Sequence, residues 1–75
     1  MTEFILDCLG EACPIPLIKV KKKMEDLAVG DVLIVEVDHS CAMKNVPEWA
    51  RNQGYHIELD DIGGGEWELI IEKTK

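Results

Sequence analysis

Basic side chains are scarce in this 75-residue sequence, which has 8 Lys and Arg residues against 15 Asp and Glu residues and a formal net charge of −7. Proteins that bind nucleic acid or an anionic membrane surface use clustered Lys and Arg residues. One basic run is present, Lys19, Lys21, Lys22 and Lys23, and such a run is typical of the solvated face of a helix. The composition therefore argues against nucleic acid or an anionic membrane as a direct partner.

Long apolar runs are also missing. No segment approaches the ~20 residues that span a bilayer, and the first four residues lack the basic stretch of a signal peptide. We therefore expect a cytoplasmic protein without membrane insertion.

The hydrophobic share of 47% is typical of a folded chain. This length supports a single domain, 1–75, in which we find no linker, repeat or low-complexity segment.

Cysteine occurs three times, which leaves one thiol over in any set of disulfides within the chain. A structural disulfide framework is rare in the cytoplasm and uses an even number of cysteines. We therefore expect thiols that are reactive, metal-binding or buried.

Apolar periodicity predicts four strands and two helices. Alternating or β-branched residues mark strands at Phe4 to Cys8, at 32–37, at 55–60 and at 66–72. Apolar residues at intervals of three and four predict an amphipathic helix that begins at Pro14 and is stopped by Gly30. The continuous apolar character of residues 32–37 predicts a central strand with both faces largely covered. Three consecutive glycines at 63–65 predict the turn of a closing hairpin.

The second helix must lie within Ser40 to Gln53, but Pro47 does not fit deep inside a helix. Asn45 and Glu48 have the spacing of a capping box, which would place Pro47 in the first turn. Residues 40–44 are then expected as an irregular turn or a kinked extension.

The order βαβαββ predicts a two-layer α/β (α+β) sandwich. Right-handed crossovers make the first three strands parallel, and the hairpin makes the fourth antiparallel. We therefore expect a four-stranded mixed sheet with both helices on one face.

The strongest chemical motif is Cys13-Pro14-Ile15-Pro16, a thiol immediately before the first helix. A sulfur at the N-cap faces the positive end of the helix dipole, which favours the thiolate. The prolines remove two N–H donors and leave the Ile15 N–H as the expected partner of the sulfur. Gly10 is expected to let the loop pass close by. The alternative is a buried, inert cysteine.

Residues Leu6 to Pro16 resemble the signature of the TusA/SirA sulfur carriers, L-D-x-x-G-x-x-C-P-x-P followed by a helix. Further resemblances follow at Gly30-Asp31, Asp38, Val46-Pro47 and Gly54-Tyr55-His56. Some details are similar to the YeeD-type branch of this family. The resemblance covers nearly the whole chain and implies the same two-layer fold.

The resemblance implies a sulfurtransferase-type carrier in which Cys13 accepts a sulfane sulfur as a persulfide and relays it. It implies no cofactor beyond this transient persulfide. The implied partners are donor and acceptor proteins such as a desulfurase, a rhodanese-like protein or a YeeE-type thiosulfate transporter. Glu11 with Lys19 or Lys22 is expected to flank the site and select partners, because charges govern encounter and specificity. The rival hypothesis is a redox-sensing or protein-interaction adaptor without catalysis.

Two further cysteines leave alternatives open. Cys8 either resolves a Cys13 persulfide into an internal disulfide or is a core residue that ends the first strand, and the second interpretation is favoured. Cys41, after the predicted central strand, is either a second sulfur acceptor or a partly buried bystander, and again the second is favoured. Together, Cys8, Cys13, His39 and Cys41 supply four side chains of the type that ligate zinc, but their spacing is poor for a zinc site, and we predict no metal.

Overall fold

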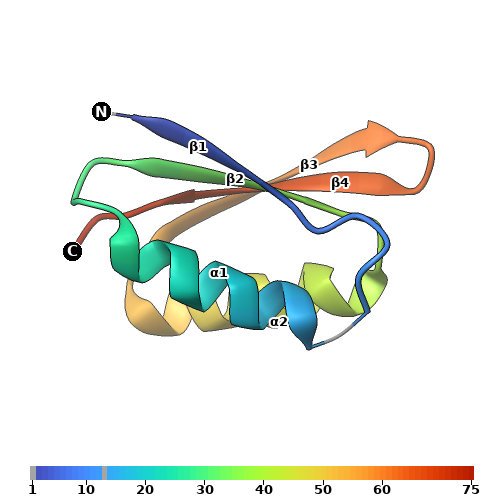
Figure 1. The fold of residues 1–75 in the computed structure, drawn as a ribbon, viewed down its shortest axis with the longest axis horizontal. Helices are drawn as coiled ribbons and strands as arrows, with labels where there is room; N and C mark the ends of the chain where they lie inside the picture. The colour runs from blue at the N-terminus through green and yellow to red at the C-terminus, as the bar shows by residue number, and fades with distance from the viewer. Residues whose placement is uncertain (1, 13) are drawn as a thin grey trace.

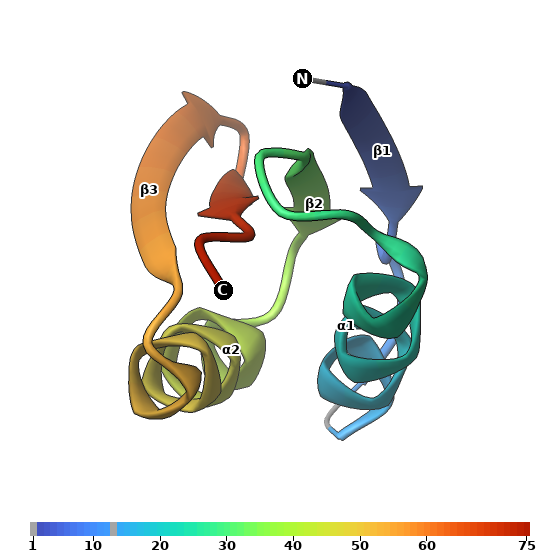
Figure 2. The ribbon, with the colours of Figure 1, turned by 90° about the vertical axis from the view of Figure 1, so that its left-hand side faces the viewer.

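The computed structural model describes residues 2–12 and 14–75. These residues form β1 (Glu3–Asp7), α1 (Ile15–Asp26), β2 (Val32–Val37), α2 (Ser40–Gln53), β3 (His56–Gly63) and β4 (Glu66–Glu72). The strands form one sheet, and both helices lie side by side against the same face of it (Figure 1, Figure 2). The predicted βαβαββ two-layer sandwich is confirmed.

The sheet has the strand order β1-β2-β4-β3. β1 and β2 are parallel, whereas β4 is antiparallel to both of its neighbours, β2 and β3. β1, β2 and β3 therefore share one direction, as predicted, and β2 is a central strand. β3 does not pair with β2, because β4 lies between them.

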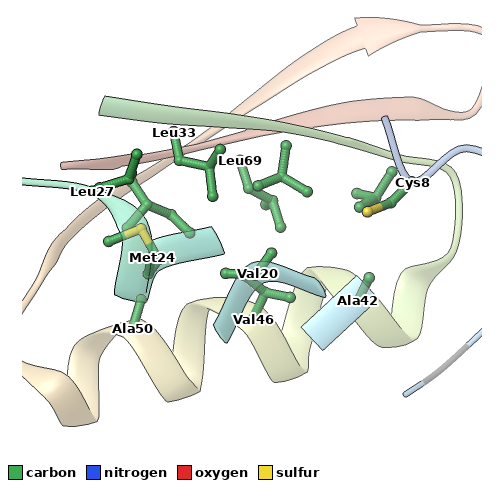
Figure 3. Close-up of a cluster of buried hydrophobic side chains, with 12 residues drawn as sticks. Cys8, Val20, Met24, Leu27, Leu33, Ala42, Val46, Ala50 and Leu69 are labelled. Carbon is green, nitrogen blue, oxygen red and sulfur yellow. The ribbon is translucent and has the colours of Figure 1, made fainter. Parts of the chain in front are cut away.

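The hydrophobic core fills the space between the sheet and the helices (Figure 3). Each helix contributes apolar residues at helical spacing, namely Val20, Met24 and Leu27 from α1 and its C-cap and Ala42, Val46 and Ala50 from α2. The strands contribute alternate residues, among them Leu33, Val35, Leu69 and Ile71. Burial of each large aliphatic side chain contributes about 1.5–3 kcal/mol, so this layer is the main source of stability.

The second face of the sheet carries no helix, which corrects the expectation that both faces of β2 are covered. Along β2, buried residues alternate with half-buried ones. Ile34 is half-buried on this open face, and its partner in β1, Ile5, is 70% exposed. β2 is shielded there by its neighbouring strands rather than by a helix.

α2 begins five residues before the predicted N-cap. It runs without interruption from Ser40 to Gln53, with His39 as its N-cap, so Asn45 and Glu48 lie inside the helix and the predicted capping box is wrong. Pro47 is an interior residue that cannot donate to the carbonyl four residues earlier. Its side chain is buried with the other inner-face residues of α2. This burial offsets the lost hydrogen bond. Tertiary packing therefore outweighs the tendency of Asn45 and Glu48 to start a helix at this point.

The C-terminal end of α1 is held by the segment that follows β4. The helix ends at Asp26, with Leu27 as its C-cap, and so stops before Gly30. The Nζ of Lys73 donates to the carbonyl oxygens of Met24 and Leu27, at 2.7 and 2.8 Å. A cation at this position also favours the negative end of the helix dipole.

Candidate functional site

The loop between β1 and α1 is fixed by hydrogen bonds of its own backbone. The Cys8 N–H donates to the carbonyl oxygen of Glu36 at 2.9 Å, which extends the pairing of β1 with β2 by one residue. The Leu9 N–H donates to Oδ1 of Asp7 at 3.0 Å, a local Asx-type turn. The loop therefore leaves the sheet along a defined path.

Asp38, which follows β2, anchors the middle of this loop. Its Oδ2 accepts the Gly10 N–H at 2.9 Å, across 28 residues of sequence, and its Oδ1 pairs with Nδ1 of His39 at 2.8 Å. The hydrogen bond from Gly10 and then the His39 ring hold the pKa of Asp38 below its ordinary value. Asp38 therefore stays ionised and ties the loop to the end of β2 at neutral pH.

Gly10 is needed for its backbone angle. Its φ is +77°, a conformation that L side chains rarely adopt, and a Cβ placed there would meet no atom of the described residues within 4 Å. The expectation that Gly10 lets the loop pass close by the Cys13 sulfur stays a prediction, because Cys13 lies outside these residues.

The start of α1 differs from the predicted arrangement by one residue. Pro14 is the N-cap, Ile15 begins the helix, and Pro16 is a buried residue of the first turn. The Ile15 N–H donates to the carbonyl oxygen of Ala12 at 3.0 Å. This amide, which was expected to face the Cys13 sulfur, is thus directed at a backbone oxygen.

Cys13 itself lies outside the described residues. The prediction that position 13 is the N-cap of the first helix is wrong, because Pro14 is the N-cap of α1. The residues on either side of Cys13, Ala12 and Pro14, are both exposed.

Cys8 is a core residue, as the favoured interpretation predicts. Its side chain is completely buried and free, and it occupies one end of the hydrophobic cluster (Figure 3). Burial, and then the negative charge of Glu11, raise the pKa of the Cys8 thiol from 9.0 to about 11. Only thiolates are effective nucleophiles, so Cys8 is unsuited to resolve a persulfide.

Glu11 and Lys19 form an ion pair that bridges the loop and the first turns of α1. The Nζ of Lys19 donates to Oε1 of Glu11, and this hydrogen bond raises the pKa of Lys19. The second carboxylate oxygen, Oε2, is buried without a hydrogen-bond partner in the described part of the chain. The negative charge of Glu11 also raises the pKa of the Cys8 thiol. Glu11 therefore links the loop to α1 and acts electrostatically on the thiol in the core.

Sequence reasoning places Glu11 with Lys19 at the site as docking charges, but it predicts neither their ion pair nor the influence of Glu11 on the Cys8 thiol. Glu11 and Lys19 are eight residues apart, and no helical or strand spacing relates a loop residue to a helix residue. The clue in the sequence was an acidic loop residue followed by a basic helix face.

Lys22 remains available on the outer surface of α1. It is exposed and lines a shallow depression together with Leu6, Lys19, Lys23 and Asp26. Lys23 lies beside it with its Nζ 4.8 Å from the centre of the Phe4 ring, a cation–π contact. The charge of Lys22 is therefore presented to solvent at this site.

Cys41 is the second residue of α2 and is exposed, so the expectation of a partly buried residue is wrong. It participates in a disulfide. The Nδ2 of Asn45, one helical turn later, donates to the Cys41 sulfur at 3.3 Å. His39, the N-cap of the same helix, is also exposed. Cys41 is therefore a surface thiol position at the N-terminal end of α2.

Neither a metal centre nor a membrane span is found in residues 2–12 and 14–75. In this part of the chain, no group of three or more His, Cys, Asp or Glu side chains converges as a ligand set. None of its helices combines the length and the apolar character that crossing a bilayer requires.

Comparison with protein families gives a match to the sulfurtransferase TusA family over residues 4–73. A protein named "Putative sulfur carrier protein TsuB" from Escherichia coli is 33% identical over 70 residues, which cover 92% of this chain and 93% of that protein. A "Putative sulfur carrier protein" from Archaeoglobus fulgidus is 34% identical over 70 residues, covering 92% and 80%.

A solved structure agrees with these relatives. The crystal structure of a SirA-like protein from Desulfitobacterium hafniense superposes with a TM-score of 0.88 at 33% sequence identity, covering 96% of this chain and 99% of that one. Sequence and fold therefore point to the same family.

Proposed function

Because the chain belongs to the TusA family of sulfurtransferases, we propose that it is a sulfur carrier that accepts a sulfane sulfur as a persulfide on Cys13. The carrier then relays this sulfur to a thiol of an acceptor protein. Residues 1–75 form one carrier domain in this proposed function.

The observation that carries this proposal is the contrast between Cys8 and the segment around position 13. Cys8 is buried and protonated at neutral pH. Ala12 and Pro14, by contrast, are exposed at the head of α1. A thiol that exchanges sulfur with other proteins must be reached from solvent, a requirement that the buried Cys8 does not meet. This failure of Cys8 supports the assignment of the carrier role to Cys13.

The transfer needs only thiol exchange. The Cys13 thiolate attacks the outer sulfur of a donor persulfide, a new S–S bond forms, and the donor thiolate leaves. In the second half of the cycle, an acceptor thiolate attacks the outer sulfur on Cys13 and the Cys13 thiolate leaves. The remaining site residues hold the loop: Asp38 binds the Gly10 N–H, and Glu11 binds Lys19. Pro14 and Pro16 fix the backbone at the start of α1.

The proposed partners are proteins that deliver or receive sulfane sulfur, such as a desulfurase, a rhodanese-like protein or a thiosulfate transporter of the YeeE type. Lys22 is the proposed docking charge, because it is exposed on the outer surface of α1, one turn after Lys19. Lys19 contributes less to docking, since its charge is paired with Glu11. The proposed location of this exchange is the cytoplasm.

Sulfur loading of variants that lack one or two of the three cysteines tests the proposed function. Reduced Cys41→Ser protein is incubated with thiosulfate or with a persulfide donor and examined by intact-protein mass spectrometry. We expect one added sulfur atom that a reductant removes. The matched control adds Cys13→Ser to the same background and should gain no sulfur.

Loss of the added sulfur with Cys13→Ser, and its retention with Cys8→Ser, support the carrier function. If no variant gains sulfur from any donor, the carrier proposal fails. An adaptor function would then be indicated if the Cys13→Ser protein still binds its partner.

A further inference from the structure

We propose that the open face of the sheet is a docking surface for a helix of a partner protein, one with an aliphatic stripe flanked by Lys and Arg residues. Both α1 and α2 lie against the other face, so neither of them covers this one (Figure 2). The inference goes beyond the proposed carrier function and does not depend on Cys13. It assigns a surface on which a partner is held while α1 stays uncovered.

The first argument is a row of isoleucines across the middle of this face. Ile5 of β1 pairs with Ile34 of β2, and Ile34 pairs with Ile70 of β4. Their neighbours along β2 and β4, such as Leu33 and Leu69, are buried in the core, so the isoleucines point away from the helices. Ile5 is 70% exposed, and the other two isoleucines are half-buried. Contiguous apolar surface with a polar rim is typical of interaction sites.

The second argument is the negative charge on both sides of the isoleucine row. One residue from each of the four strands contributes to a row of carboxylates, Asp7, Glu36, Glu68 and Asp60. On the other side of the isoleucines, Glu3 of β1 and Glu72 of β4 lie opposite Val32 of β2. Within residues 2–12 and 14–75, none of these six carboxylates forms an ion pair with a Lys or Arg side chain. The face therefore presents unneutralised negative charge to a partner.

The third argument is that these charges are unfavourable in the free protein. Like charges directly opposite each other on antiparallel strands are destabilising, and Glu68 pairs with both Glu36 and Asp60. At the edge strand β3, His56 lies 3.7 Å from Glu58, and among the described residues it is the one group on this face that can carry a positive charge. Cations brought by a partner remove the repulsion, so the same charges favour binding.

The spacing of the rows fits a helix that lies along the isoleucines. Neighbouring strands are ~4.8 Å apart, which is close to the ~5.4 Å pitch of an α-helix. Aliphatic residues on successive turns of the helix therefore meet Ile5, Ile34 and Ile70 in order. Each carboxylate row is two residues along the strands from the isoleucines, or ~6.6 Å. A helix with its side chains is ~10–12 Å wide, so Lys or Arg residues on its two flanks reach both carboxylate rows.

The charge also decides among the possible occupants of this face. Two copies of the chain that met through it would bring their carboxylate rows together, and like charges across an interface are unfavourable. Nucleic acid and anionic lipid are repelled in the same way. A helix with Lys and Arg on both flanks of its aliphatic stripe matches the apolar row and both charged rows at once. Such charge matching accelerates encounter and gives specificity against neutral or acidic partners.

Nuclear magnetic resonance with a synthetic peptide tests this inference. The probe is a helical peptide with leucines in one stripe and lysines on both flanks, and its control has glutamate in place of every lysine. Each peptide is added to the isotope-labelled full-length protein under reducing conditions. We expect the lysine peptide to shift the amide signals of Ile5, Ile34 and Ile70 and to leave those of α1 and α2 nearly unchanged. Added salt should weaken this binding, and the glutamate peptide should not bind.

Matched variants test the charged and the apolar parts of the surface separately. The Glu36→Lys, Glu68→Lys double variant reverses the central charges, and we expect it to bind the lysine peptide roughly tenfold more weakly. The control variant, Glu25→Lys with Glu48→Lys, changes the net charge equally at exposed positions of α1 and α2 and should weaken binding much less. Ile5→Ser removes an exposed aliphatic group without touching the core and should weaken binding several-fold. Circular dichroism checks that each variant is folded.

Several outcomes would overturn the inference. Signal shifts confined to the helices, or equal binding of the glutamate peptide, exclude this face as the docking surface. So does an equal loss of affinity in both charge-reversed variants, which would show attraction to net charge alone. Self-association of the free protein that Glu36→Lys and Glu68→Lys abolish would assign the face to a second copy of the chain. Sulfur loading of Cys13 is measured separately, so the carrier function stands or fails independently of these results.

Discussion

The burial of the Cys8 thiol makes the stability of this protein depend on pH in the alkaline range. Folding raises the pKa of Cys8 from 9.0 to about 11. Above pH 9 the unfolded chain therefore releases a proton that the folded chain keeps. The folded state binds more protons, so the free energy of unfolding falls as pH rises from 9 to about 11.

The size of this effect follows from the shift. A pKa difference of one unit between the folded and unfolded states corresponds to about 1.4 kcal/mol. Raising the pH from 9 to about 11 therefore lowers the free energy of unfolding by roughly 3 kcal/mol. Between pH 8 and pH 10 the expected loss is roughly 1 kcal/mol by the same relation. The Cys8 side chain is completely buried, so solvent does not screen the effect.

Urea denaturation at several pH values between 8 and 10 measures the loss. The reference protein carries Cys13→Ser and Cys41→Ser, which leave Cys8 as the one thiol, and the test protein adds Cys8→Ala. Lysine titration is common to both proteins and cancels in the difference. At pH 8 the Cys8→Ala protein should be less stable than the reference protein, because the substitution leaves a cavity in the core. The difference in free energy of unfolding between the two proteins should be smaller by roughly 1 kcal/mol at pH 10, since only the reference protein is destabilised by the Cys8 titration. Two parallel curves would refute the assignment of a raised pKa to Cys8.

Three other substitutions test contacts described above. Lys73→Met removes a cation from the last carbonyls of α1 and should lower stability by roughly 2 kcal/mol in urea denaturation, whereas the exposed Lys22→Met should change it little. Asp38→Ala should abolish the hydrogen-exchange protection of the Gly10 amide without unfolding the sheet, and unchanged protection would exclude this anchor. Gly54→Ala forces alanine into a left-handed C-cap with φ of +85°; thermal unfolding should reveal a loss of about 1 kcal/mol.

The regular elements could be predicted because their signals are local. Apolar alternation and helical spacing located β1, α1, β2 and the closing hairpin. The start of α2 could not be predicted in this way. The capping residues Asn45 and Glu48 give a local signal, but the buried inner face of the helix begins earlier, at Ala42, and tertiary packing prevails.

The candidate site was predicted less completely, because its contacts join segments far apart in sequence. The Gly10–Asp38 hydrogen bond depends on the parallel pairing of β1 with β2. The ion pair between Glu11 and Lys19 depends on how the loop turns into α1. Neither follows from a periodic pattern. The assignment of Cys8 to the core did follow, since it continues the apolar end of β1.

The place of β4 in the sheet has a consequence for the synthesis of this protein. β4 is translated after the other strands, yet it pairs with both β2 and β3. A nascent chain that has emerged only as far as β3 therefore has one edge of β2 unpaired and lacks the buried residues Leu69 and Ile71. The core that supports the loop before α1 is thus completed only when residues 66–72 leave the ribosome. A chain that stops before β4 carries the Cys13-Pro14-Ile15-Pro16 motif on an incomplete domain, so the proposed carrier surface is completed only after translation has passed this strand.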